Sequence, residues 1–278
     1  MVLTTRIASL ALALSVMSVS GAFAQATLAD LMQRHGVPVK DGSLDAAFDS
    51  LAAPTVPVDP GSFAAPLAVL TTASGGEQVE AAYAFGILAG RSGRAASPQE
   101  LTAAGQALIA MIASGDRRSR IAGARVAGRA FAAPYDRSGV GPIVPAGMTA
   151  ALFTLLNGDR EIDQLAAMDA LGLLRERSAV GSLTERYYFY RDANKRALGG
   201  GALEALARIG DPSTGEIVKL LAADKWADGK DATGLAVAFA RERLLKDGSI
   251  AVIQQALGDK SRRDQARGYL AELGAPVP

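Results

Sequence analysis

The sequence contains no cysteine and few aromatic residues, and both shortages restrict the possible folds and activities. Without cysteine, the chain has no disulfide, no thiol nucleophile, no cysteine-ligated metal and no lipid anchor on an N-terminal cysteine. Aromatic residues make up 5% of the chain and hydrophobic residues 49%, so the core must consist mostly of Ala, Leu, Val and Ile. Small and branched aliphatic side chains favour closely packed helices over a β-sandwich.

An excess of charge of one sign is also lacking, because 29 Lys and Arg stand against 28 Asp and Glu. Nucleic acid is not expected as a partner, since its phosphates call for a concentrated basic stripe. The single histidine, His35, follows a short predicted helix and precedes Gly36. A Ser-His-Asp triad or a zinc site needs partners that this chain largely lacks, so we predict a solvated capping role for His35.

The first 24 residues have the pattern of a secretory signal peptide. Arg6 supplies positive charge, residues 7–19 are uncharged and apolar, and Ala22-Phe23-Ala24 is a small-x-small cleavage pattern. The alternative is a membrane span, which needs ~20 apolar residues, more than this run contains. We predict cleavage after Ala24, no membrane span in the mature chain, and a location in the periplasm or outside the cell.

An internal repeat runs through most of the chain. A small residue near the end of an apolar helix recurs at Gly86, Gly128, Gly172, Ala207, Ala240 and Ala271. The residue before each of them is apolar, which predicts an amphipathic helix whose small residues lie where a neighbouring helix approaches closely. A second apolar helix precedes each one. Two helices per unit, repeated about six times over residues 61–278, predict an all-α fold of the α-solenoid class.

The turns between helices support this interpretation. Gly115-Asp116, Gly158-Asp159 and Gly258-Asp259 each place Gly at a helix end and Asp where it is predicted to cap the next helix. Pro134 to Pro145 is predicted to be a long loop.

Three segments resemble a known family. Ala202 to Pro212 (ALEALARIGDP) resembles the end of the second helix in short bacterial HEAT repeats, the type found in phycobilisome lyase-like proteins. Asp116 to Arg120 and Asp259 to Arg263 match the Asp-x-x-x-Arg pattern at the start of that helix. The resemblance implies a HEAT-like superhelix that binds other proteins, and it does not imply enzymatic activity.

Residues 25–60 differ from the repeat and are predicted to cap its first unit, since the open end of a solenoid exposes apolar surface. Leu28 to Arg34 and Leu44 to Leu51 are predicted to form two short helices. Pro54 to Pro60 contains three prolines, which exclude a helix and predict an extended linker.

Two further motifs have both a functional and a structural interpretation. Gly199-Gly200-Gly201 lacks the third glycine of G-x-G-x-x-G, so close helix approach or a broken helix is predicted rather than a nucleotide site. The acids around Trp226 are spaced four and three apart, unlike the alternating acids of calcium loops. They are Asp224, Asp228 and Asp231, beside Gly229. Helix caps and solvated acids are predicted there, and neither a metal nor a cofactor.

Tyr187-Tyr188-Phe189-Tyr190 is the strongest candidate for a binding surface. A helix cannot bury four successive residues on one face, so at least one ring should face solvent. Exposed Tyr beside Arg is typical of interface hot spots. We predict partner contacts at Tyr187, Tyr188, Tyr190 and Arg191; in the alternative, Tyr187 and Tyr190 pack inward and only Tyr188 reaches the surface.

These patterns predict an exported HEAT-repeat protein that binds or scaffolds an unknown protein partner in the bacterial envelope, with no catalytic residue. The alternatives are an envelope hydrolase or lyase that uses carboxylates on the inner surface, and a glycan-binding protein that uses the tyrosines. A cleft with convergent carboxylates of perturbed pKa favours an enzyme, whereas a broad, shallow face favours a scaffold.

Overall fold

The computed structural model describes residues 27–39, 43–49, 57–92, 95–132, 142–223 and 231–277. All regular structure in these ranges is helical, with fourteen α-helices and short 3₁₀ turns, which confirms the predicted all-α class. The predicted signal peptide lies outside the described residues, as does most of the predicted loop from Pro134 to Pro145. None of the helices in the described ranges has the length and apolarity that a membrane crossing requires.

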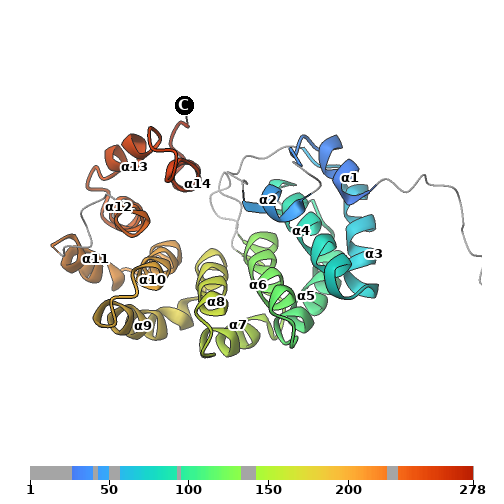
Figure 1. The fold of residues 1–278 in the computed structure, drawn as a ribbon, viewed down its shortest axis with the longest axis horizontal. Coiled ribbons are helices and arrows are strands. Elements are labelled where there is room, and N and C mark those ends of the chain that lie inside the picture. Colours follow the sequence, from blue (N-terminus) through green and yellow to red (C-terminus); the bar gives the residue numbers. More distant parts are fainter. Residues whose placement is uncertain are drawn as a thin grey trace, which may run out of the picture.

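Twelve helices alternate between the two layers of an arc (Figure 1). The outer layer consists of α3 (Ala64–Thr72), α5 (Pro98–Ile112), α7 (Met148–Leu156), α9 (Val180–Asp192), α11 (Thr214–Ala222) and α13 (Ile250–Ala256). The inner layer consists of α4 (Gly75–Ser92), α6 (Arg117–Phe131), α8 (Glu161–Leu173), α10 (Arg196–Ile209), α12 (Ala232–Leu245) and α14 (Arg263–Glu272). Each outer helix packs against the inner helix that follows it, and each inner helix packs against the next inner helix.

Small residues set the spacing of the inner helices, as the repeat predicted. A Cβ atom on Gly128 of α6 would lie 2.8 Å from the Cα of Ala170 in α8. A Cβ on Gly172 of α8 would lie 2.7 Å from the Cα of Ala205 in α10. A Cβ on Gly86 of α4 would lie 3.0 Å from a side-chain atom of Val126 in α6. At Gly128 and Gly172, the neighbouring backbone therefore comes too close for a side chain, whereas at Gly86 a neighbouring side chain fills the space.

The three predicted Asp caps have different outcomes. Asp116 caps α6 as predicted, because its carboxylate accepts the backbone N–H of Ser119 at 2.7 Å. The prediction for Asp159 is wrong, since Arg160 occupies the N-cap position of α8 and its side chain makes no capping hydrogen bond. Asp259 accepts the N–H of Ser261 at 2.8 Å, in the turn before α14 rather than in the helix itself.

The Arg of the Asp-x-x-x-Arg pattern satisfies carbonyl groups of the turn that follows the preceding outer helix. Arg120 donates to the carbonyl oxygens of Ser114 and Gly115 at 3.0 and 2.7 Å. Gln164 takes the same position in α8, four residues after the N-cap, and donates to the carbonyl of Gly158 at 2.6 Å. A long hydrogen-bond donor at this position therefore satisfies carbonyl groups of the turn that follows the outer helix.

The N-terminal helices α1 (Leu28–Arg34) and α2 (Leu44–Asp49) lie where the sequence predicted them and pack against α4. His35 ends α1, but its predicted solvated role is wrong. Its Nε2 atom lies 2.8 Å from the Oγ of Ser62, in the 3₁₀ turn Pro60–Phe63, and the imidazole is partly buried. His35 thus fixes the end of α1 to the start of the helical arc.

Candidate functional site

The aromatic run on α9 is divided between the core and the surface. Tyr187 and Tyr190 are fully buried, so neither ring can touch a partner in this conformation. The hydroxyl of Tyr190 donates to Gln164 at 3.0 Å and thereby joins α9 to α8. Tyr188 and Phe189 are 37% and 60% exposed, and only they, with Arg191, present this run to solvent.

Cations of the same chain cover both exposed rings. The Arg191 guanidinium lies over the ring of Tyr188 at 5.3 Å, and the Lys195 ammonium lies over Phe189 at 6.0 Å. Part of the attraction that a partner would supply is thus already made within the chain. Partner binding at Tyr188 and Arg191 stays a prediction.

A pocket of about 430 Å³ opens on the inner side of the arc. Its lining comes from five inner helices, α6, α8, α10, α12 and α14. Apolar side chains predominate, and the polar groups are few: Arg125, Asp169, Glu204, Thr233 and Gln265. An apolar hollow with a few convergent polar groups is the usual form of a binding site.

The pocket exists because its walls carry small residues. The three-glycine run lies within α10, which continues unbroken from Arg196 to Ile209, so the broken-helix alternative is excluded. Gly200 faces Thr233 of α12, and a Cβ on Gly201 would lie 2.9 Å from a methyl group of Leu165 in α8. Ala197 and Ala232 also line the pocket and are exposed. Larger residues at these positions would fill the space.

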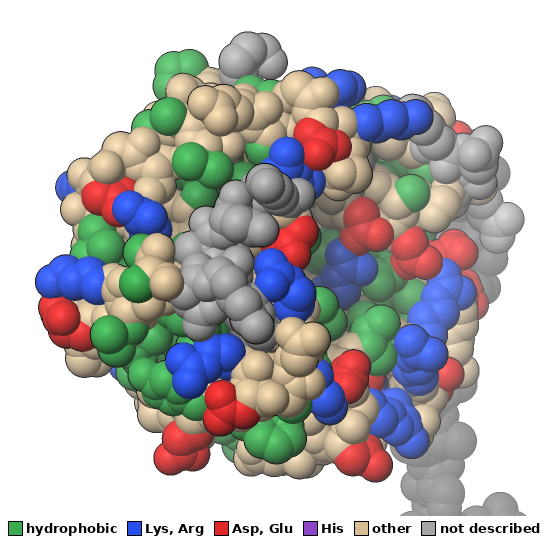
Figure 2. Space-filling view, turned by 60° about the vertical axis from the view of Figure 1, so that its left-hand side comes forward, with side chains coloured by type: hydrophobic (Ala, Val, Ile, Leu, Met, Phe, Trp, Pro, Cys, Tyr) green, Lys and Arg blue, Asp and Glu red, His purple; other side chains and the backbone are tan. Residues whose placement is uncertain are grey.

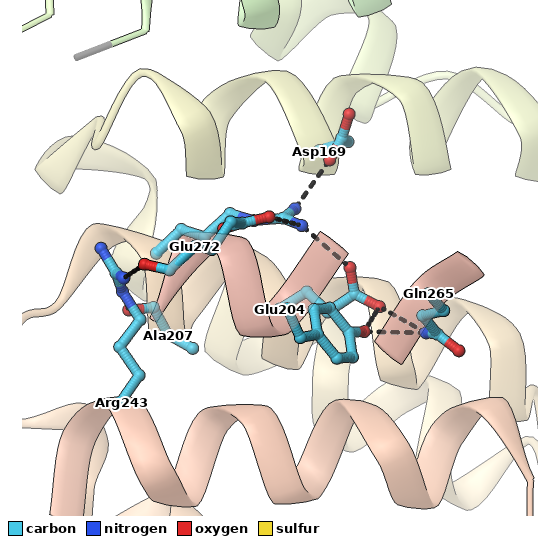
Figure 3. A network of polar contacts seen from close by, with 8 residues as sticks. Asp169, Glu204, Ala207, Arg243, Gln265 and Glu272 are labelled. Atoms are coloured by element: carbon cyan, nitrogen blue, oxygen red, sulfur yellow. Dashed lines mark hydrogen bonds and ion pairs between the residues drawn. The ribbon is translucent and has the colours of Figure 1, made fainter. Parts of the chain in front are cut away.

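Figure 3 shows a network of polar contacts, and its Asp169, Glu204 and Gln265 are part of the pocket lining. Arg208 of α10 is buried, and its Nη1 donates to Asp169 of α8 at 2.7 Å. Its Nε and Nη2 both donate to Glu272 of α14 at 2.9 Å, a bidentate pair. Glu204 lies one turn before Arg208, with its carboxylate 3.4 Å from the guanidinium. Three carboxylates from three helices thus surround one cation.

The Glu204 carboxyl faces both the network and the pocket. One oxygen accepts hydrogen bonds from the Tyr269 hydroxyl and, at 3.4 Å, from Gln265. Burial raises the pKa of Glu204; Arg208 and the Tyr269 hydroxyl lower it, and the carboxylates of Asp169 and Glu272 raise it again. The net direction is upward, so the ionised form of this carboxyl is disfavoured in the folded protein.

A second hollow of about 460 Å³ shares Asp169, Glu204 and Gln265 with the first. Asp49 of α2 also lines it, so this hollow lies between the N-terminal helix α2 and the last helix α14. In Figure 2, acidic and basic side chains gather around a hollow on the right of the view. The two hollows together carry five acidic residues and four arginines.

Within the described ranges, no group of three or more His, Cys, Asp or Glu is arranged to hold a metal ion. Of the acids around Trp226, only Asp231 is described. Its carboxylate caps α12 by accepting the N–H of Gly234 at 2.8 Å, and it pairs with Arg196 at 2.6 Å. Asp231 therefore has the capping role that the sequence predicted; Asp224, Asp228 and Gly229 lie outside the described residues.

In comparisons with known proteins, no family model and no curated protein matches this sequence. The resemblance to HEAT repeats is therefore supported by the sequence segments 116–120, 202–212 and 259–263.

Replacing Glu204 with Gln should change how stability depends on pH. Because folding raises the pKa of Glu204 above its ordinary value of 4.5, ionisation of this group opposes folding. The cost of this ionisation to folding stability is absent at low pH. It develops as the pH rises from the ordinary pKa of the unfolded chain through the raised pKa of the folded protein. We therefore expect Glu204→Gln to become more stable than the wild type as the pH increases. Thermal unfolding of both proteins from about pH 4 to about pH 8 measures this difference. Glu216→Gln, on the surface of α11, controls for the change in net charge; an equal pH effect in both variants would contradict the assignment.

Proposed function

We propose that this protein is an exported HEAT-like solenoid that binds another protein on the inner face of its arc and acts as a scaffold in the bacterial envelope. The signal-peptide pattern supports export. The alternating helix pairs, the glycine contacts between inner helices and the HEAT-like segments support the solenoid. In such an architecture, a ligand on the inner face gathers contacts from several units at once.

The observation that carries this proposal is the composition of the inner pocket. Five consecutive inner helices contribute to it, and most of its lining is apolar. Ile162, which lines the pocket, is 41% exposed although it lies on the inner side of the arc. Exposed apolar surface in a concave site is typical of a place where a partner docks.

The pocket also has a feature that favours the enzyme alternative, because Asp169 and Glu204 converge there and the pKa of Glu204 is raised. A pair of carboxylates whose environments differ is the pattern of an acid–base site. However, the Arg208 guanidinium lies against both carboxylates, and the Tyr269 hydroxyl occupies an oxygen of Glu204. These contacts engage the carboxylates in charge pairing, a role that suits recognition of a ligand better than proton transfer, so we favour binding.

Filling the pocket should strongly reduce partner capture. Ala197 is exposed in the pocket, so Ala197→Trp places an indole there without removing a core contact. In crosslinking within the living envelope, we expect the specific partner of the wild type to be captured about tenfold less by this variant. Ala110→Trp, at an exposed position on outer helix α5, is the matched control and should capture the partner normally.

A third variant tests the other surface. Tyr188→Ala/Phe189→Ala removes both exposed rings of α9 and leaves the pocket intact. If only this variant loses the partner, the partner docks on α9 and the inner-face proposal is wrong. If the wild type captures no protein at all, the scaffold function itself is wrong, and the enzyme or glycan alternative takes its place.

A further inference from the structure

The inner pocket is lined mostly by apolar residues and has an acidic end. Ile121, Ile162 and Leu165 line it with the small residues of α10, and Asp169 and Glu204 follow one turn after Leu165 and Gly200 on α8 and α10. Asp169 is 34% exposed and Glu204 21% exposed at the side chain, so both carboxylates can be reached from the pocket. This shape matches a group that has a long apolar stem and a charged tip.

The carboxylates at this end exceed the cations that neutralise them. Arg208 forms ion pairs with Asp169, Glu204 and Glu272, so three carboxylates share this one guanidinium. Arg125 also lines the pocket and interacts electrostatically with Asp169. It pairs with Asp49 and lies over the ring of Phe48 at 5.1 Å. Unbalanced negative charge in partly buried surroundings favours an incoming cation.

The lining of the two hollows together also carries more negative than positive charge. The two connected hollows carry five acidic residues and four arginines, so negative charge remains in excess when both are counted together. Burial raises the pKa of Glu204, and the neighbouring carboxylates add to this rise, so the ionised form of Glu204 is disfavoured. A cation placed beside Glu204 would relieve that cost, and the relief would add to the affinity.

We propose that this pocket receives a lysine or arginine side chain from an extended segment of the partner protein. The aliphatic stem would lie across Ile162 and Leu165, and the charged tip would pair with Asp169 and Glu204. Long basic side chains bury their stems on apolar surface and keep the charge at a polar site, which is the arrangement offered here. This inference rests on the proposed function and adds the chemistry of the segment that is recognised.

The test uses the purified chain and arrays of nine-residue peptides with random flanks. The central position is fixed as Arg, Lys, citrulline or Glu. Citrulline keeps the shape of arginine and removes its charge. We expect the wild type to bind the Arg and Lys arrays roughly tenfold more tightly than the citrulline array, because a hydrogen bond between charged groups is worth more than a neutral one.

Three variants locate the effect. Asp169→Asn should lose most of the preference for Arg over citrulline, and Ala197→Trp should lose binding to every array. Asp264→Asn removes the same charge from the second hollow, where this carboxylate is 82% exposed, and should keep the preference. A loss in Asp264→Asn equal to that in Asp169→Asn would mean general attraction between charges and would overturn the proposal.

The remaining outcomes separate this inference from the proposed function. If the arrays show no preference for a basic residue, but Ala197→Trp still loses its crosslinked partner, the inner face binds a partner of other chemistry and only this inference is wrong. If free arginine competes as strongly as an Arg-centred peptide, the pocket takes a small cation, and the peptide source is overturned. If no array binds and Ala197→Trp keeps its partner, both proposals are wrong.

Discussion

Arg208→Ala should lower the free energy of unfolding by about 3–5 kcal/mol, the range observed when one partner is removed from a buried ion pair. The Arg208 side chain is 7% exposed, and Glu272 is 6% exposed. With the guanidinium gone, the carboxylate of Glu272 would stay buried without its cation, and Asp169 would lose its partner at 2.7 Å. Urea denaturation with linear extrapolation measures the loss.

The position of Arg208 explains why the effect should be large. The residue lies on α10, and its partners lie on α8 and α14, one inner helix before it and two after it. Each inner helix otherwise packs mainly against its immediate neighbours in the layer. The guanidinium also lies 5.8 Å from the ring of Phe239 on α12. A single cation therefore joins four consecutive inner helices.

Lys219→Ala is the control for Arg208→Ala. Lys219 pairs with Glu216 on α11, where both side chains are more than half exposed, so its removal should cost less than about 1 kcal/mol. A similar small loss in Arg208→Ala would show that the network contributes little and that solvent already screens its carboxylates.

The helices could be predicted from the sequence because their signals are local. Apolar spacing and small residues at fixed offsets predicted the inner helices, and the glycine contacts of Gly128 and Gly172 confirm the reason. Capping was less predictable, as Asp159 shows. An Asp after a Gly can cap only if the helix begins at the next residue, and α8 begins one residue later, at Glu161.

The aromatic run shows where local pattern is insufficient. Four successive rings point in different directions around a helix, so the pattern required at least one exposed ring. The alternative in which Tyr187 and Tyr190 pack inward is confirmed, although Phe189 is exposed as well as Tyr188. The choice depends on what lies beside α9. Gln164 of α8 accepts a hydrogen bond from the Tyr190 hydroxyl. This contact, between residues 26 positions apart in the sequence, stabilises the buried position of the Tyr190 ring.

The inner pocket could not be predicted for a related reason. Its lining extends from Ile121 to Gln265, and no short segment contains more than a few of its residues. Glu204 and Arg208 lie within the segment that resembles HEAT repeats, where they were interpreted only as part of a helix end. Their place in the charged network depends on Glu272. This residue is 64 positions after Arg208 in the sequence, and the curvature of the arc brings the two side chains into contact.

Gly172→Leu should destabilise the protein by about 3 kcal/mol, at the upper end of the usual cost of overpacking a core. A Cβ at this position would already lie 2.7 Å from the Cα of Ala205, and the obstacle is backbone that cannot turn aside as a side chain can. Accommodating Leu would require α8 and α10 to separate, which would also displace Asp169 from Arg208. Chemical denaturation measures the stability, and small-angle X-ray scattering measures any opening of the arc.

Gly181→Leu is the matched control, because it makes the same substitution in outer helix α9 at a glycine with no atom near its Cβ position. This variant should be neutral or more stable by up to about 1 kcal/mol, since Leu has the higher helix propensity. If the two variants unfold alike, α8 and α10 do not meet as closely as the glycine contact requires. The curvature that brings Glu272 back to Arg208 would then need another cause, and the pocket that depends on it would lose its structural basis.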